Sequence, residues 1–163
     1  MKQIPKDLYP DIITPEYLAR GSLFGAISSD CVSFIIDEAR LLSLDVGDKV
    51  FDCGQRGEAF FVVVDGELRF FKNHLGNLLH TRDISFGEET GFVAMIALHD
   101  HVGFAQASEP SLVLEISADL FARLQQSYPT DFGIITLNLA RDMARTIRKL
   151  NNALIDKTIE FEA

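Results

Sequence analysis

The residues Phe60–Phe71 read FFVVVDGELRFF, two runs of aromatic and branched residues on either side of the pair Asp65-Gly66. Aromatic and β-branched residues favour β-strands. An Asp-Gly pair between such runs favours the positive φ angles of a type I′ turn. The stretch therefore predicts a β-hairpin with its turn at these two residues.

Short apolar runs of the same kind continue on both sides of this stretch, from residue 40 to residue 116. They are separated by glycines, namely Gly47, Gly54, Gly57, Gly66, Gly76 and Gly87. Short strands at such spacing are typical of an all-β sandwich or barrel. We therefore expect a β domain in the middle of the chain.

A helical pattern precedes this β region, after a polar leader over residues 1–22. Ser28 offers a side chain that can cap the N-terminus of a helix. Apolar residues then recur at helical spacing, at Val32, Ile35, Ile36 and Ala39. We expect a helix here, whereas the prolines of the leader keep it from forming one long helix.

Two further helices are expected after the β region. Ser117 is a candidate N-cap for a short helix, and Tyr128-Pro129 interrupts it because proline fits best in the first turn of a helix. From Pro129 to about Lys157 there is no other proline and no glycine beyond Gly133. This segment predicts one helix roughly 40 Å long.

The long helix has two apolar stripes. Phe132, Ile135 and Leu139 are expected to face the chain's own β domain. A second stripe follows the 3-4-3-4 spacing of a coiled coil, at Ala140, Met143, Ile147, Leu150 and Leu154. Since one small β domain cannot cover two faces of so long a helix, we expect this stripe to join two copies of the chain. Packing within a single chain is the alternative.

Composition excludes several classes of protein. The 163 residues suit one domain, and the net charge of −9 repels the phosphates of nucleic acids. No apolar run approaches the ~18 residues of a membrane span, and the first residues do not resemble a signal peptide. We therefore expect a cytoplasmic protein that does not enter membranes. Its two cysteines, Cys31 and Cys53, are too few for a disulfide framework.

From Leu23 to about Ile155, the order of these features resembles the cyclic-nucleotide-binding domain of the catabolite-activator (Crp/Fnr-like) family. No single motif is decisive, and the resemblance rests on an ordered set: Val46–Phe51 (VGDKVF), Gly54, Gly57, Phe60–Phe70, Phe86-Gly87-Glu88, the run LVLEI, Phe121 and Tyr128-Pro129. It implies a mainly β fold with flanking helices. An eight-stranded jelly roll (a double-stranded β-helix) would occupy residues 23–128, and a dimerisation helix residues 129–159.

The resemblance also implies a ligand site. In the family, Phe-Gly-Glu opens a short helix whose free N–H groups hold the cyclic phosphate, and the glutamate accepts from the ribose hydroxyl. A helix is accordingly expected over residues 89–98. Thr146 on the long helix falls where the catabolite activator contacts adenine. The implied ligand-binding residues are Phe86, Gly87, Glu88, Glu89, Thr90, His101, Val102 and Thr146.

One part of the family's phosphate site is missing. His101-Val102 stands where the family has Arg followed by Ser or Thr, and no arginine or lysine occurs between Asp83 and Asp119. Losing a buried charge partner costs roughly 2–5 kcal/mol, or about thirtyfold to several thousandfold in affinity. We expect cAMP or cGMP binding to be altered or weakened. A neutral, hydroxylated or aromatic metabolite would suit Phe86, Val102, Phe104 and Thr146 better than an anion.

The sequence therefore predicts a non-catalytic regulatory module. An unidentified small-molecule effector would reorient the short helix at 117–127 against the long helix, and the homodimer would signal to a partner protein. No cofactor or metal is expected. Only eight residues, DKTIEFEA, follow Ile155, so we expect no helix-turn-helix and no direct binding to DNA.

Two alternatives remain open at this stage. One is a degenerate scaffold that dimerises but holds no small ligand. The other is a cupin-like, metal-dependent enzyme, because His99 and His101 have the H-x-H spacing that places two imidazoles on one side of a strand.

Overall fold

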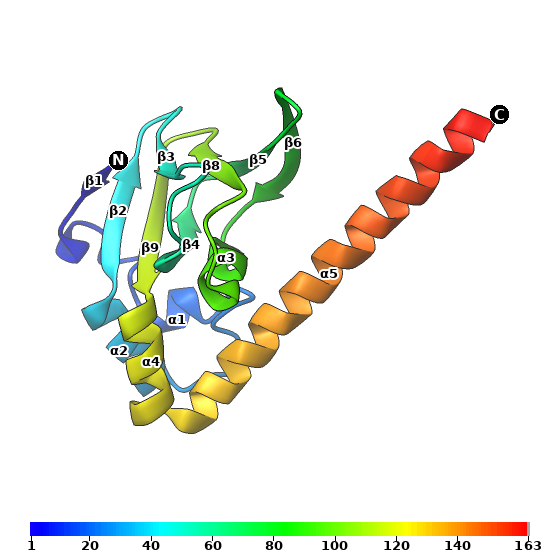
Figure 1. The fold of residues 1–163 in the computed structure, drawn as a ribbon. Coiled ribbons are helices and arrows are strands. Elements are labelled where there is room, and N and C mark those ends of the chain that lie inside the picture. Colours follow the sequence, from blue (N-terminus) through cyan, green and yellow to red (C-terminus); the bar gives the residue numbers. More distant parts are fainter. Residues whose placement is uncertain (163) are drawn as a thin grey trace.

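The computed structural model describes residues 1–162, without the side chains of His74 and of residues 156–162. This part of the chain forms two antiparallel sheets that pack face to face, as expected for a jelly roll (Figure 1). The first sheet has the order β1 (Lys2–Gln3), β2 (Arg40–Leu44), β9 (Ser111–Ser117), β4 (Ala59–Asp65), β7 (Glu89–Thr90). The second has the order β3 (Lys49–Phe51), β8 (Gly103–Ala107), β5 (Leu68–His74), β6 (Asn77–Ile84).

Strand β4 lies between two hydrophobic cores. Phe60, Val62 and Val64 belong to a core between the first sheet and the helices, and Phe61 and Val63 belong to the core between the two sheets. Alternate residues of a strand point to opposite faces of the sheet, so a strand buried on both faces is apolar at every position. This explains the unbroken run FFVVV.

The predicted hairpin at Asp65-Gly66 is wrong. Strand β4 pairs with β7 and β9, whereas β5 pairs with β6 and β8, so the chain passes from one sheet to the other at this point. Gly66 has a φ of 81°, but Asp65 does not have the positive φ that a type I′ turn requires. The Asp-Gly signal marks a corner of the jelly roll and not a hairpin turn.

The hairpin in this region is formed by β5 and β6. Its turn consists of Leu75 and Gly76, which have φ angles of 52° and 81°, and it joins the paired residues His74 and Asn77. Both turn residues therefore have the left-handed conformation of a type I′ turn. The turn carries a leucine at a position where Asn or Asp is usual, which is why the sequence did not reveal it.

The helices gather toward one end of the β domain (Figure 1), and they pack against the face of the first sheet that carries Phe60, Val62 and Val64. The predicted caps are confirmed, since Ser28 Oγ accepts from the backbone N–H of Cys31 at 3.2 Å and Ser117 Oγ from that of Leu120 at 3.1 Å. The elements are the 3₁₀ turn η1 (Lys6–Leu8), α1 (Pro15–Leu18), α2 (Ser29–Glu38), α3 (Phe92–Ala97), α4 (Ala118–Ser127) and α5 (Pro129–Glu162).

Helix α5 is attached to the domain by its first turns. Ile135 and Leu139 are buried in the core between the first sheet and the helices, which we call the helix-side core. The carboxylate of Asp131 accepts from the N–H and the hydroxyl of Ser28, each at 2.8 Å. Asn138 Nδ2 donates to the carbonyls of Leu23 and Gly25, at 3.0 and 2.9 Å.

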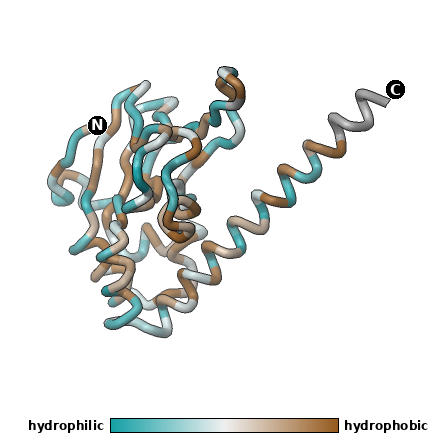
Figure 2. The backbone as a smooth tube through the Cα atoms, viewed as in Figure 1, coloured by the Kyte–Doolittle hydropathy of each residue, from teal (hydrophilic) through white to brown (hydrophobic). Residues whose placement is uncertain are grey.

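The remainder of α5 projects away from the β domain (Figure 1). Apolar segments nevertheless recur along the projecting part, as Figure 2 shows. Within residues 1–162, none of the helices has both the length and the apolar character needed to cross a bilayer.

Candidate ligand-binding site

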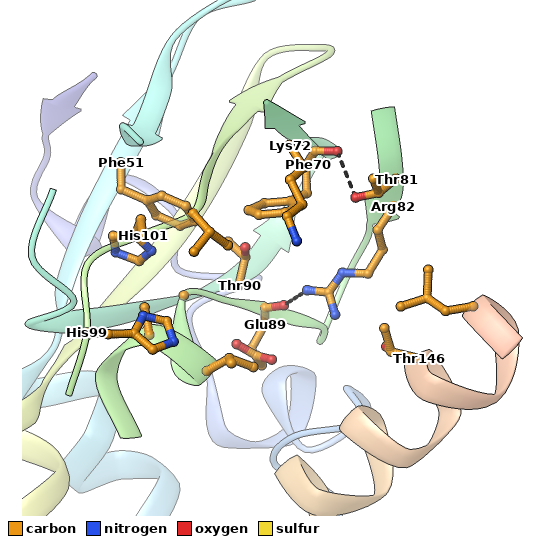
Figure 3. A pocket seen from close by; sticks show the side chains of 15 residues that line it. Phe51, Phe70, Lys72, Thr81, Arg82, Glu89, Thr90, His99, His101 and Thr146 are labelled. Atoms are coloured by element: carbon orange, nitrogen blue, oxygen red, sulfur yellow. Dashed lines mark hydrogen bonds between the residues drawn. The ribbon is translucent and has the colours of Figure 1, made fainter. Parts of the chain in front are cut away.

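A cavity of about 370 Å³ lies between the second sheet, the start of α3 and the middle of α5 (Figure 3). Cavities of this size accommodate small organic ligands. The second sheet contributes residues of β3, β5 and β6 to its wall, and Glu89 and Thr90 of β7 lie at its base. One turn apart on α5, Thr146 and Leu150 form the opposite wall.

Five of the eight residues predicted to bind the ligand line this cavity, namely Glu89, Thr90, His101, Val102 and Thr146. These residues come from three separate parts of the chain, and the fold brings them together. Their contact with a ligand stays a prediction. Phe86, Gly87 and Glu88 are not part of the wall.

Phe86, Gly87 and Glu88 have structural contacts instead. The ring of Phe86 packs against that of Tyr17, with 4.9 Å between their centroids. Gly87 lies so close to Gly21 that a Cβ added at Gly87 would be 2.3 Å from the Cα of Gly21. The Glu88 carboxylate accepts from the N–H of Ser85 at 2.9 Å and from its hydroxyl at 3.2 Å. This segment holds the leader against the β domain.

The helix predicted over residues 89–98 begins three residues later than expected, at Phe92. Gly91, with a φ of 98°, is the glycine that precedes it, and it lines the cavity. The residue that follows this glycine is a phenylalanine whose side chain is buried in the core. The Phe-Gly-Glu order at residues 86–88 therefore does not stand at the start of the helix beside the cavity.

His101 occupies the cavity wall without supplying a positive charge. It is 6% exposed, and its ring stacks on that of Phe51 with 3.8 Å between centroids. Burial lowers the pKa of His101 below 6.5, so the imidazole is neutral at neutral pH. Its backbone N–H donates to Gln55 O and its carbonyl accepts from Gly54 N, both at 2.8 Å.

His99 and His101 do not form the metal site of the cupin-like alternative. Among the residues whose side chains the structure describes, no group of three or more His, Cys, Asp or Glu side chains is placed to hold a metal ion. The Nδ1 atom of His99 lies 2.7 Å from the backbone carbonyl of Asp100. Phe104, which was also expected at the pocket, stacks on Phe71 on the opposite face of the second sheet.

The cavity contains basic residues although the family's arginine is missing. Lys72 of β5 and Arg82 of β6 both line the cavity, and both lie outside the segment between Asp83 and Asp119. A bulge in β6 opposite Phe70 and Phe71 places the consecutive residues Thr81 and Arg82 on the cavity wall. Strand pairing, which the sequence did not reveal, determines this placement.

Arg82 joins the β domain to α5. One of its terminal nitrogens donates to the backbone carbonyl of Glu89, and the other lies 3.6 Å from the carboxylate of Asp142. Asp142 is one helical turn before Thr146, so both face the cavity side of α5. The ion pair therefore lies where the helix leaves the domain.

Glu89 is a buried acid at the base of the cavity. It is 4% exposed, and its carboxylate accepts from the N–H of Phe92 at 3.1 Å. Burial raises the pKa of Glu89 to about 7, although the nearby Arg82 and the hydrogen bond from Phe92 act in the opposite direction. The side chain is therefore partly protonated at neutral pH.

The five residues of the predicted dimer seam do not share one exposed face. Met143 packs against the helix-side core and Leu150 lines the cavity, so both face the chain's own domain. Ala140, Ile147 and Leu154 lie on the exposed side of α5. Their exposed neighbours at coiled-coil spacing are Leu137, Ala144 and Asn151. We call the six residues on this side the outer stripe.

No protein-family model matches the sequence, and no curated protein matches it at a significant level. Solved structures do match. A cyclic nucleotide-binding domain from Methylobacillus flagellatus superposes with a TM-score of 0.79 and 18% identity, covering 93% of this chain and 85% of that one. The catabolite activator protein of Thermus thermophilus has a TM-score of 0.71 and 23% identity over 82% of this chain, which spans 62% of that protein.

The sensor domain of the transcriptional regulator DNR from Pseudomonas aeruginosa is similar too. Its TM-score is 0.65 with 20% identity, covering 83% of this chain and 89% of that one. These likenesses show that the chain has the fold of cyclic-nucleotide-binding domains. The expected jelly roll with a long C-terminal helix is thereby confirmed.

Proposed function

We propose that this chain is a non-catalytic regulatory domain that binds a small molecule in the cavity and transmits its presence through α5. The observation that carries the proposal is the composition of the cavity wall. Phe70 and Thr90 of the β domain face Thr146 and Leu150 of the long helix across one space. A bound molecule would touch both parts, so its binding energy could favour one placement of the helix over another.

Helix α4 supplies a second connection. The ring of Phe121 on α4 lies 4.8 Å from that of Phe132 on α5 and also contacts Phe60 and Phe92. Phe92 opens α3, the helix beside the cavity. A change at the start of α3 would therefore reach the junction of α4 and α5 through aromatic contacts, in line with a reorientation of α4 against α5.

The output that we propose is a homodimer that acts on a partner protein in the cytoplasm. The outer stripe supports dimerisation because Leu137 and Ile147 are 55% and 58% exposed at coiled-coil spacing. The net charge of −9 favours a protein partner over DNA. The effector is proposed to differ from cAMP and cGMP, or to include them only weakly, because neutral His101 stands in place of the family's arginine.

The thermal midpoint of unfolding tests for a ligand. We would measure it with and without about 1 mM cAMP, cGMP or AMP. A ligand at ~100 times its Kd adds roughly 2.7 kcal/mol to the free energy of unfolding, which is a shift of a few degrees. We expect at most a small shift with these three nucleotides, and a full shift with the effector when a metabolite panel is screened.

A matched pair of variants assigns any shift to the cavity. Val102→Trp would place a bulky ring at the cavity wall, whereas Val46→Trp changes another exposed valine, which lies outside the cavity. The shift should vanish in the first and persist in the second. A shift that persists in both would place the ligand elsewhere.

A dimerising scaffold without a ligand is the second candidate function. It is favoured by the buried Phe92 at the start of α3, which puts no carboxylate where a ribose hydroxyl would need one. A metabolite panel that produces no shift, together with a stable dimer in sedimentation experiments, would support the scaffold over the sensor.

A further inference from the structure

The charged residues of the cavity are distributed unequally between its two ends. Lys72 and Arg82 lie on the β5–β6 hairpin at the end nearest α5, and His99 and His101 lie at the other end (Figure 3). His101 is neutral because it is buried. The positive charge of the cavity is therefore concentrated at the end where the helix forms the wall.

Lys72 has no ion-pair partner among the side chains that the structure describes, and its amine points into the cavity (Figure 3). Arg82 faces the same space, and its side chain is only 26% exposed. Asp142 and the partly ionised Glu89 offset part of the charge of Arg82, but neither has a described contact with Lys72. An anionic group is the species that would satisfy both cations.

Arg82 retains the capacity to bind such a group. A guanidinium has five N–H donors, and the described contacts of Arg82 are one hydrogen bond to the Glu89 carbonyl and the ion pair with Asp142. At 3.6 Å, that ion pair is longer than the ~2.7–2.9 Å of a charge-assisted hydrogen bond. The contact between Arg82 and Asp142 is therefore a weak one. An anionic group of a ligand that lies closer to Arg82 could replace the Asp142 carboxylate.

We propose that the cavity binds a small organic anion whose carboxylate, phosphate or sulfonate group lies between Lys72 and Arg82 and displaces Asp142 from Arg82. The proposal rests on the proposed function, because it requires the cavity to be a ligand site. The apolar body of the anion would lie against Phe70, Val93 and Leu150. The anion would thus bind at the opposite end of the cavity from His101.

The displaced carboxylate has a second partner within reach. Arg145, one turn further along α5, already lies 3.3 Å from Asp142. Asp142 therefore keeps an ion pair within its own helix when Arg82 turns to the ligand. What is lost is the ionic contact between the helix and the β domain, so ligand binding would loosen α5 at this point.

Two dyes with nearly the same aromatic body test the anion site. The sulfonate 8-anilino-1-naphthalenesulfonate carries a negative charge, whereas N-phenyl-1-naphthylamine is neutral, and both fluoresce when they enter an apolar site. We expect both to bind the wild-type protein. Lys72→Met combined with Arg82→Met should weaken the sulfonate at least tenfold and leave the neutral dye within about twofold.

Further variants control for charge and folding. Arg69→Met removes a cation from the same hairpin, where it pairs with Glu67 and Asp83 outside the cavity, and should leave both dyes unaffected. Lys72→Met alone changes an exposed residue and should still weaken the sulfonate severalfold if the double variant does not fold. Val102→Trp should reduce binding of both dyes and so place them in the cavity.

Asp142→Asn tests the competition between internal and external anion. It should tighten binding of the sulfonate about threefold, because Arg82 no longer has a competing carboxylate. Arg145→Met, which removes the other partner of Asp142, should not tighten it. Weaker or unchanged binding in Asp142→Asn would overturn the displacement step.

The outcomes separate this proposal from the proposed function. If the double variant binds both dyes as the wild type does, the cavity accepts apolar bodies without an anion site, and only the present proposal fails. If the wild type binds neither dye, the cavity is not a ligand site and both proposals fail. If the wild type binds the sulfonate dye and the double variant does not, a competition experiment identifies the anionic group. Displacement of the dye by benzoate indicates a carboxylate ligand, and displacement by AMP or inorganic phosphate indicates a phosphate ligand.

Discussion

The first turns of α5 and its later turns belong to one continuous helix but have opposite surroundings. Up to Met143, the helix is attached by the buried Ile135 and Leu139, by the hydrogen bonds that Asp131 accepts and by those that Asn138 donates. Beyond Met143, the helix touches the domain only along the cavity among its described contacts, and its leucines and isoleucines are largely exposed. The first part of the helix therefore attaches it to the domain, whereas the second part leaves apolar side chains exposed to solvent.

The boundary between these two parts coincides with the ion pair of Arg82 and Asp142. Before it, contacts within the chain determine the position of the helix. After it, the described contacts of the helix with the domain are those along the cavity, and we propose that a ligand there and a second chain on the outer stripe influence its position. The following predictions test this division, in order of decreasing expected effect on stability.

Leu139→Ala should lower the free energy of unfolding by about 2–5 kcal/mol, because it removes a side chain that is 1% exposed in the helix-side core. Chemical denaturation measures this change. Leu137→Ala, two residues away on the outer stripe, is the matched control and should change the stability of the monomer by less than about 0.5 kcal/mol. Equal losses at the two positions would contradict the division of the helix into two faces.

The raised pKa of Glu89 should make the free energy of unfolding decrease as pH rises. Its pKa is raised from 4.5 to about 7 in the folded state, so between these values the folded protein binds more protons than the unfolded chain. The free energy of unfolding should therefore decrease by up to about 3 kcal/mol from pH 4.5 to pH 7 and change little above that. Denaturation at a series of pH values measures the slope.

Glu89→Gln isolates this contribution, because glutamine resembles the protonated acid. The variant should be as stable as the wild type near pH 5 and more stable at pH 8. His101, whose lowered pKa has the opposite effect as pH falls, is present in both proteins and cancels in the difference. A variant that retains the wild-type slope would show that another group is responsible.

Asn138→Ala should lower the free energy of unfolding by about 1–3 kcal/mol, since the carbonyls of Leu23 and Gly25 lose their donor. Asn151→Ala is the control, because it changes an exposed asparagine beyond the boundary and should have little effect on the monomer. A helix that depended on its whole length for attachment would be weakened equally by both.

Ile147→Asp should have the smallest effect on monomer stability, below about 0.5 kcal/mol, because the side chain is 58% exposed. It should nevertheless abolish the proposed dimer, since a carboxylate would be buried in a coiled-coil seam. Sedimentation velocity measures the oligomeric state. Asn152→Asp adds the same charge off the outer stripe and should leave the dimer intact; an unchanged dimer in both variants would place the interface elsewhere.

Much of the fold could be predicted because its signals are local. Ser28 and Ser117 each precede an amphipathic run, and a serine hydroxyl caps the helix that follows it. The long helix is likewise indicated by its lack of helix breakers. Strand pairing is not local, and so the Asp65-Gly66 pair predicts a hairpin turn although β4 and β5 lie in different sheets.

The cavity was less predictable for the same reason. The family resemblance predicts one site that includes the following six residues, of which three line the cavity and three do not: His101, Val102 and Thr146 line it, whereas Phe86, Gly87 and Glu88 lie outside its wall. Gly87 carried a misleading signal, because a glycine needed for close contact with Gly21 looks the same as one that approaches a ligand.

Lys72 and Arg82 could not be found from sequence order, because their placement depends on the register of β5 with β6 and on its bulge. The alternation of Phe70 and Lys72 along β5 was the only available signal. This alternation indicates that Phe70 and Lys72 lie on the same face of the sheet, but it does not indicate whether that face is turned to the cavity.

The length of α5 beyond Met143 also has a mechanical consequence. The helix continues for 19 residues to Glu162, which at ~1.5 Å per residue is a rigid arm of roughly 28 Å. Pivoting by about 10° at the Arg82–Asp142 contact would move the far end of the helix by roughly 5 Å, a distance similar to the pitch of an α-helix. A rearrangement around one carboxylate would thus be magnified into a sideways displacement of the far end of the helix.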